Sequence, residues 1–88
     1  MEYLLFSYPN CSKCEDLKKT LVETPVDFKE YSLVEKESKL KIRDFLKHVK
    51  RDQKGAITLP ALIVLNDTDE VTVLNTEKEF KEWWISRD

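Results

Sequence analysis

The hydrophobic pattern of this chain predicts four strands. Tyr3–Phe6 and Ala61–Leu65 are continuous apolar runs, which favour strands buried on both faces of a sheet. The stretch Val26–Leu33 opens with alternating apolar and charged residues, a pattern typical of a strand. Val71–Leu74 follows the third strand after only a short turn at Asn66–Asp69, and so short a connection implies an antiparallel hairpin.

A helix is predicted between the first two strands. Asn10 is a good N-cap, and apolar side chains recur at helical spacing after it, so the helix should start at about Cys11. Its buried stripe consists of Cys14, Leu17 and Leu21. Thr24-Pro25 ends this helix, because the residue before a proline is steered out of helical backbone angles.

Two further helices are expected, each preceded by a capping-box pattern. Ser32-x-x-Glu35 precedes the second helix, and Gly55, the only glycine of the chain, is predicted as its C-cap. Thr76-x-x-Glu79 precedes the final helix. The apolar stripe of the second helix is Ile42, Phe45, Leu46 and Val49, and that of the final helix is Phe80, Trp83 and Trp84. The predicted order is β-α-β-α-β-β-α, an α/β fold.

Length and composition fit one small domain spanning residues 1–88. Apolar residues make up 41% of the chain, enough for a core, and the net charge of −2 gives no field that would favour nucleic acid as a partner. The apolar runs are far shorter than the ~20 residues that cross a bilayer. Because the first residues lack the basic start and long apolar region of a secretory signal, we expect a cytoplasmic protein without a membrane partner.

The only two cysteines form a C-x-x-C, Cys11-Ser12-Lys13-Cys14. A disulfide that closes so small a loop removes little entropy from the unfolded chain, so stabilisation is a poor reason for it. In a reducing compartment such a pair is typically catalytic or metal-binding. Structural zinc needs four ligands, and beyond the two cysteines the chain offers only His48 as a further strong ligand, so no metal site is predicted.

A cysteine at a helix start is expected to be activated as a nucleophile. Unpaired backbone N–H groups and the positive end of the helix dipole favour the thiolate of Cys11, by up to ~2 kcal/mol in a partly buried site. One pKa unit corresponds to ~1.36 kcal/mol, so a fall of about one to one and a half units is available. Lys13 adds a positive charge, whereas Glu15 and Asp16 oppose the effect. We therefore expect a moderately acidic Cys11.

Cys14 lies one turn further along the helix, on its buried stripe. It should be less exposed than Cys11, which suits a resolving thiol. In the predicted reaction Cys11 attacks a substrate disulfide to give a mixed disulfide, and Cys14 then attacks Cys11 and releases the reduced substrate.

The chain resembles the glutaredoxin branch of the thioredoxin superfamily. The resemblance rests on the first strand, the segment Tyr8–Cys14, the Thr58-Leu59-Pro60 motif, and the final hairpin and helix. It implies a thioredoxin-like fold with a four-stranded mixed sheet flanked by three helices, and a cis bond before Pro60. It also implies that the backbone of Leu59 faces Cys11 and pairs with an extended substrate. The implied substrate-binding residues are Tyr8, Pro9, Asn10, Ser12, Lys13, Thr58, Leu59 and Pro60.

Three positions depart from the family pattern. Ser12-Lys13 replaces the usual Pro-Tyr, and Tyr8 stands where many glutaredoxins carry a basic residue. Leu74-Asn75-Thr76 replaces the Gly-Gly before the last helix. These departures argue against glutathione as the reductant and favour a thioredoxin-reductase-like flavoprotein or a narrower protein substrate.

The sequence thus predicts a monomeric thiol–disulfide oxidoreductase of electron transport and cell redox homeostasis. It should need no cofactor beyond the reversible Cys11–Cys14 disulfide, and its partner should be a protein disulfide or a low-molecular-weight thiol. Two alternatives stay open. One is a metal-handling C-x-x-C module of the copper or zinc chaperone kind, although such folds usually run β-α-β-β-α-β. The other is a thioredoxin-fold binding module that has lost its activity.

Overall fold

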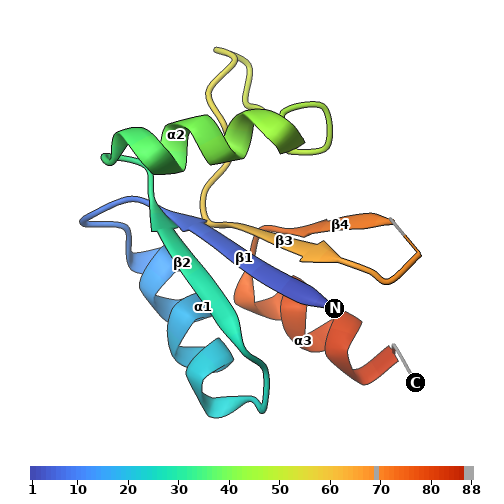
Figure 1. The fold of residues 1–88 in the computed structure, drawn as a ribbon. Helices are drawn as coiled ribbons and strands as arrows, with labels where there is room; N and C mark the ends of the chain where they lie inside the picture. The colour runs from blue at the N-terminus through green and yellow to red at the C-terminus, as the bar shows by residue number, and fades with distance from the viewer. Residues whose placement is uncertain (69, 87–88) are drawn as a thin grey trace.

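A computed structural model describes residues 1–68 and 70–86 (Figure 1). Its elements are β1 (Glu2–Ser7), α1 (Ser12–Glu23), β2 (Phe28–Ser32), α2 (Lys36–Ile42), the 3₁₀ turn η1 (Arg43–Phe45), β3 (Ala61–Leu65), β4 (Val71–Leu74) and α3 (Glu77–Ser86). The predicted order of strands and helices is confirmed. Within the described residues, no helix is both long and apolar enough to cross a membrane.

The four strands form one mixed sheet in the order β2-β1-β3-β4. β1 pairs in parallel with β2 and antiparallel with β3, and β3 forms the predicted antiparallel hairpin with β4. β1 and β3 are the central strands, which explains their continuous apolar runs. The hairpin turn was predicted at Asn66–Asp69, and its residue Asp69 lies outside the described residues.

Helices cover both faces of the sheet, with α1 and α3 on one side and α2 on the other (Figure 1). Successive side chains of β1 point to opposite faces, so that Leu5 joins the core beneath α1 and α3, and Phe6 joins the core beneath α2. The first core contains Leu17, Leu21 and Phe80 from the helices, and the second contains Ile42, Phe45 and Val49. This arrangement is a thioredoxin-like fold.

The second strand is shorter than predicted. It was expected over Val26–Leu33 but spans Phe28–Ser32, at the edge of the sheet. Among the described strands β1 is its only neighbour, and their register runs from Tyr3 opposite Phe28 to Ser7 opposite Ser32. An edge strand can extend only as far as its partner, and the apolar alternation of the sequence does not reveal where that partner ends.

The capping box predicted for the second helix is wrong. Glu35 is the N-cap of α2, and none of the described side chains makes a capping hydrogen bond there. Ser32 belongs to β2 instead, and its carbonyl oxygen accepts a hydrogen bond from the N–H of Glu35, 3.0 Å away. The pairing of β2 with β1 therefore determines the conformation of Ser32.

The predicted role of Gly55 is also wrong, although its conformation is unusual as expected. The helical segment ends at Phe45, and Gly55 lies in a separate turn with a φ of +83°. The N–H of Gly55 donates to the carbonyl of Asp52, whose side-chain Oδ1 accepts from two further N–H groups of the turn. A bridge between Arg51 and Ile57 closes this loop, and Thr58 follows directly. The positive φ explains the glycine; a turn, not a helix end, requires it.

Candidate active site

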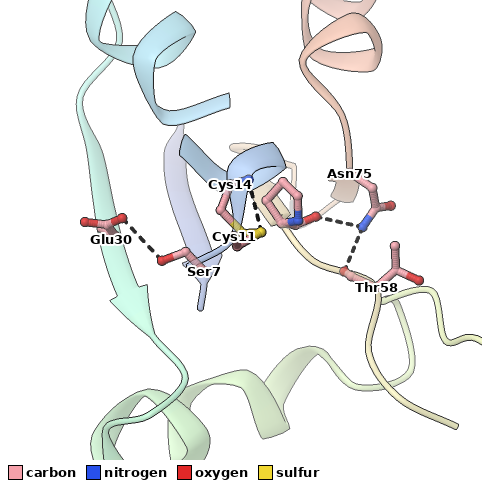
Figure 2. Close-up of a disulfide and its surroundings, with 7 residues drawn as sticks. Ser7, Cys11, Cys14, Glu30, Thr58 and Asn75 are labelled. Atoms are coloured by element: carbon pink, nitrogen blue, oxygen red, sulfur yellow. Dashed lines mark hydrogen bonds between the residues drawn. A yellow bond between two sulfur atoms is a disulfide. The ribbon is translucent and has the colours of Figure 1, made fainter. Parts of the chain in front are cut away.

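The two cysteines lie at the junction between β1 and α1 and are joined in a disulfide (Figure 2). Their Cα atoms are 5.2 Å apart. Cys11 is half-buried, whereas Cys14 is only 3% exposed and shares the buried stripe of α1 with Leu17 and Leu21. Cys11 is thus more exposed than Cys14, as predicted.

Cys11, rather than the predicted Asn10, is the N-cap of α1. Its backbone is extended, and its Sγ accepts a hydrogen bond from the N–H of Cys14 at 3.2 Å. Its carbonyl oxygen also accepts from the N–H of Glu15 at 3.1 Å. Asn10 instead has a φ of +60°, a left-handed conformation that Asn tolerates better than most residues. The sulfur thus takes the place of a capping oxygen, next to the unpaired N–H groups of the helix start.

The residues on either side of Cys11 face solvent. Tyr8 is 50% exposed, and Pro9, Asn10, Ser12 and Lys13 are exposed as well. The acidic residues predicted to oppose thiolate formation, Glu15 and Asp16, also face solvent. Solvent screens their charges, which weakens their effect on the sulfur relative to the nearby helix N–H groups.

A polar cluster lies beside Cys14, on the β2 side of the disulfide. Glu30 of β2 accepts a hydrogen bond from the buried Ser7 hydroxyl at 3.2 Å (Figure 2). It also forms an ion pair with Lys18 at 2.9 Å. These three residues line a hollow of about 250 Å³ together with Cys14 and Tyr8. Sequence reasoning missed this cluster, since its members come from three separate elements.

The Thr58–Pro60 segment lies at the same end of the central strands as the cysteines. Phe6, near the end of β1, pairs with Ala61, the first residue of β3, so the chain leaving β1 and the chain entering β3 are neighbours. The Leu59–Pro60 bond is cis, as the resemblance implies. Thr58 and Leu59 are half-buried and Pro60 is buried.

Asn75 contacts this segment, a role that sequence reasoning did not predict, since it noted Asn75 only as part of a departure from the family pattern. Its side-chain amide donates to the carbonyl oxygens of Thr58 and Pro60, at 3.1 and 3.0 Å (Figure 2). In the sequence it is a polar residue between the end of β4 and the cap of α3. That position suggests a turn and carries no signal of a contact with a segment 15 to 17 residues away.

The start of α3 is held by the predicted capping residues. The N–H of Glu79 donates to the Thr76 hydroxyl at 3.0 Å, and Glu79 Oε1 accepts from the N–H of Asn75 at 2.9 Å. This second bond, together with the nearby charge of Lys50, holds the pKa of Glu79 below its ordinary value, although burial acts in the opposite direction. The capping box therefore also anchors Asn75.

A second, wider hollow of about 540 Å³ lies between α1 and α3 and includes Lys13 of the cysteine motif. Within it, Glu77 and Lys81 form an ion pair at 2.7 Å. This hydrogen-bonded pair lowers the pKa of Glu77 and raises that of Lys81. Across residues 1–68 and 70–86, no three His, Cys, Asp or Glu side chains are grouped so as to hold a metal ion.

Comparison with known proteins agrees with this geometry. The family model described as Glutaredoxin matches residues 4–69, well over half of the chain and including both cysteines and the cis proline. Neither the curated proteins nor the solved structures gave a match. The fold, the disulfide at the helix start and the extent of the family match establish that the chain belongs to the glutaredoxin family.

Proposed function

We propose that this protein reduces disulfides by dithiol exchange, with Cys11 as the nucleophile and Cys14 as the resolving thiol. The observation that carries the proposal is the position of the Cys11 sulfur. Cys11 is more exposed than Cys14, its sulfur caps the first helix through the N–H of Cys14, and it forms a disulfide with that buried partner.

Activation of the reduced enzyme follows from the same contact. After reduction of the disulfide, the N–H of Cys14 can donate to a thiolate at Cys11, and hydrogen bonds to a charged acceptor are stronger than those to a neutral one. The helix dipole acts in the same direction. Both effects favour the ionised form of Cys11, which is the form that attacks a disulfide.

The exchange then proceeds in two balanced steps. The Cys11 thiolate attacks one sulfur of the substrate disulfide, forming a new S–S bond while the substrate S–S bond breaks and one substrate thiolate leaves. The Cys14 thiolate next attacks the Cys11 sulfur, forming the Cys11–Cys14 disulfide and releasing the second substrate thiolate. Both leaving thiolates take protons from solvent. The substrate gains two electrons, which the protein dithiol loses.

An extended substrate would be held by the backbone of Leu59. Within the described part of the chain, neither the N–H nor the C=O of Leu59 forms a hydrogen bond. Backbone groups left unpaired beside a disulfide are suited to pair with a peptide strand, which brings main-chain hydrogen bonds and orients the substrate sulfur. This supports a protein or peptide disulfide as the substrate.

The cycle needs a two-electron thiol donor to restore the dithiol. Asn75 fills the place where the family resemblance leads one to expect glycine, and Tyr8 lacks a positive charge. These features favour a dithiol donor, such as a thioredoxin-reductase-like flavoprotein, over glutathione. The proposed direction of the reaction places the protein in a reducing compartment such as the cytoplasm.

A single-turnover experiment tests this function without knowledge of the donor. Pre-reduced protein is mixed with a peptide that carries one disulfide, and mass spectrometry follows both the peptide thiols and the Cys11–Cys14 disulfide. Two peptide thiols should form for each Cys11–Cys14 disulfide. Cys14→Ser should accumulate a mixed disulfide on Cys11, and Cys11→Ser should neither react nor form an adduct. Turnover by Cys11→Ser at the wild-type rate, or an adduct only on Cys14, would contradict the assignment.

A further inference from the structure

We propose that Asn75 is a positioning residue that fixes the Thr58–Pro60 segment and so holds the Leu59 backbone ready to pair with a substrate. This inference rests on the proposed function and adds to it a residue that acts at a distance from the sulfur. It predicts which substrates lose reactivity when Asn75 is changed: those with a peptide backbone, and not small disulfides.

The geometry of the Asn75 amide carries the argument. Its Nδ2 donates to the carbonyl oxygens of Thr58 and Pro60, the residues on either side of Leu59, at 3.1 and 3.0 Å. One NH₂ group therefore holds the Thr58–Leu59 peptide, which carries the N–H of Leu59, and the Pro60–Ala61 peptide that follows the cis bond. The Asn75 side chain is itself buried, with only 4% of the residue exposed. Water therefore has little access to the bond with Pro60, and the bond with Thr58 is partly shielded.

Three further hydrogen bonds, the first from the backbone N–H of Asn75, join Asn75 and Thr58 by a second route and so close a ring. The N–H of Asn75 donates to Glu79 Oε1 at 2.9 Å, and Glu79 Oε2 accepts from Lys50 Nζ at 3.4 Å. The carbonyl of Lys50 accepts from the N–H of Thr58 at 2.9 Å, which returns the ring to the segment that Asn75 holds. The first turn of α3 is thus tied to both ends of the chain that enters β3.

The oxygen of the Asn75 side chain indicates that the NH₂ group is the part that holds the proline segment. Within the described residues, its Oδ1 is buried without a hydrogen-bond partner. An unsatisfied buried oxygen destabilises a fold, so an apolar side chain would be better tolerated here if filling space were the only requirement. The two bonds to the carbonyls offset this cost.

Asn75→Asp is the sharpest test, because the two side chains have the same shape and an ionised Asp has no donor. The measured quantity is the rate constant for oxidation of the reduced protein by two disulfides: an extended peptide, and hydroxyethyl disulfide, which has no peptide backbone. We expect the rate with the peptide to fall by about tenfold, as the loss of about 1.4 kcal/mol of binding implies. The rate with hydroxyethyl disulfide should change by less than about twofold, and so should alkylation of Cys11 by iodoacetamide.

The matched control is Asn66→Asp, the same substitution at the opposite end of β3. Asn66 follows β3, and its Oδ1 accepts a hydrogen bond from the N–H of the next residue, a role that an Asp can fill. This variant should react with both disulfides at the wild-type rates. A protonated Asp regains one donor, so the peptide-specific defect of Asn75→Asp, as a ratio to wild type, should shrink as pH is lowered.

Asn75→Ser provides a second variant if Asn75→Asp does not fold, since a hydroxyl keeps one donor without adding charge. It should show a smaller loss with the peptide only. Equal losses with both disulfides, or no loss with the peptide in a folded variant, would overturn the positioning role while leaving dithiol exchange intact. A wild-type protein that reduces neither disulfide would instead refute the proposed function, and the positioning role with it.

Discussion

The cysteine loop (residues 8–14) and the proline segment (residues 58–60) are neighbours at one end of the central strands, yet they are held by different kinds of interaction. The Cys11 sulfur is fixed by a helix that starts at the next residue and by an N–H three residues away. The proline segment is fixed by Asn75, 15 to 17 residues further along the chain. The nucleophile is therefore a local feature, and the proposed substrate-binding segment depends on where α3 packs.

This difference implies that the two halves of the site can be perturbed separately. Changes at the start of α3 should act first on the proline segment, because Asn75, just before α3, donates directly to the carbonyl oxygens of Thr58 and Pro60. Changes at the start of α1 should act on the sulfur itself. The predictions below test that separation, beginning with the largest expected effect.

Phe80→Ala should cost the most stability. Phe80 is 1% exposed and joins α3 to the core shared with Leu17 and Leu21 of α1. Removing a buried aromatic side chain typically lowers the free energy of unfolding by about 3–5 kcal/mol. Denaturant unfolding followed by circular dichroism measures this loss. Ile85→Ala, on the same helix but 78% exposed, should change stability by less than about 0.5 kcal/mol. Equal losses in the two variants would mean that α3 does not pack as described.

Thr76→Ala should lower stability by about 1 kcal/mol, the usual cost of losing an N-cap. The Thr76 hydroxyl accepts from the N–H of Glu79 and so also supports the anchor of Asn75. Ser12→Ala makes a comparable change at the start of α1, where the cap is the Cys11 sulfur, and should alter stability by less than about 0.5 kcal/mol. A larger effect at Ser12 than at Thr76 in urea titrations would contradict the contrast between the two helix starts.

Gly55→Ala should destabilise the loop that leads into the proline segment by about 1 kcal/mol, because a side chain disfavours its φ of +83°. A Cβ at this position would meet no other atom within 4 Å, so the cost is one of backbone conformation alone. Gly55→Asn should cost less, since Asn tolerates left-handed angles. Thermal unfolding of the two variants compares these costs, and an equal loss in both would point to sterics instead.

Glu79→Gln should produce the smallest effect, and one that depends on pH. The folded protein holds the pKa of Glu79 below its ordinary value, so ionised Glu79 stabilises the fold above about pH 4.3, the pKa of an unperturbed Glu. That contribution is lost as pH falls through the lowered pKa. The stability difference between wild type and Glu79→Gln should therefore be constant near neutral pH and shrink in acid. A difference that grows in acid would contradict the assignment.

The sequence was a sufficient guide where the determinants are neighbours. The stripe of α1, its end at Thr24 and the cap of α3 all depend on residues within a turn or two, and all are confirmed. The central strands were also predictable, because burial on both faces leaves a continuous apolar run in the sequence.

The prediction failed where distant partners decide the structure. Ser32 belongs to a strand because β1 lies beside it, although its own sequence suits a helix cap. Asn10 was the expected cap, but a sulfur can take that place, and the φ of +60° at Asn10 turns the chain so that Cys11 does. Asn75 could not be recognised from the sequence, because its partners are carbonyl oxygens brought near by the packing of α3.

The most direct test of the central claim is a titration of the Cys11 thiol in the reduced Cys14→Ser variant, followed by the ultraviolet absorbance of the thiolate. A sulfur that caps a helix and accepts the N–H of residue 14 should ionise below about 8.5, the pKa of a free cysteine. A midpoint clearly under that value is the predicted result. A midpoint at or above it would contradict the account of how this protein activates its nucleophile.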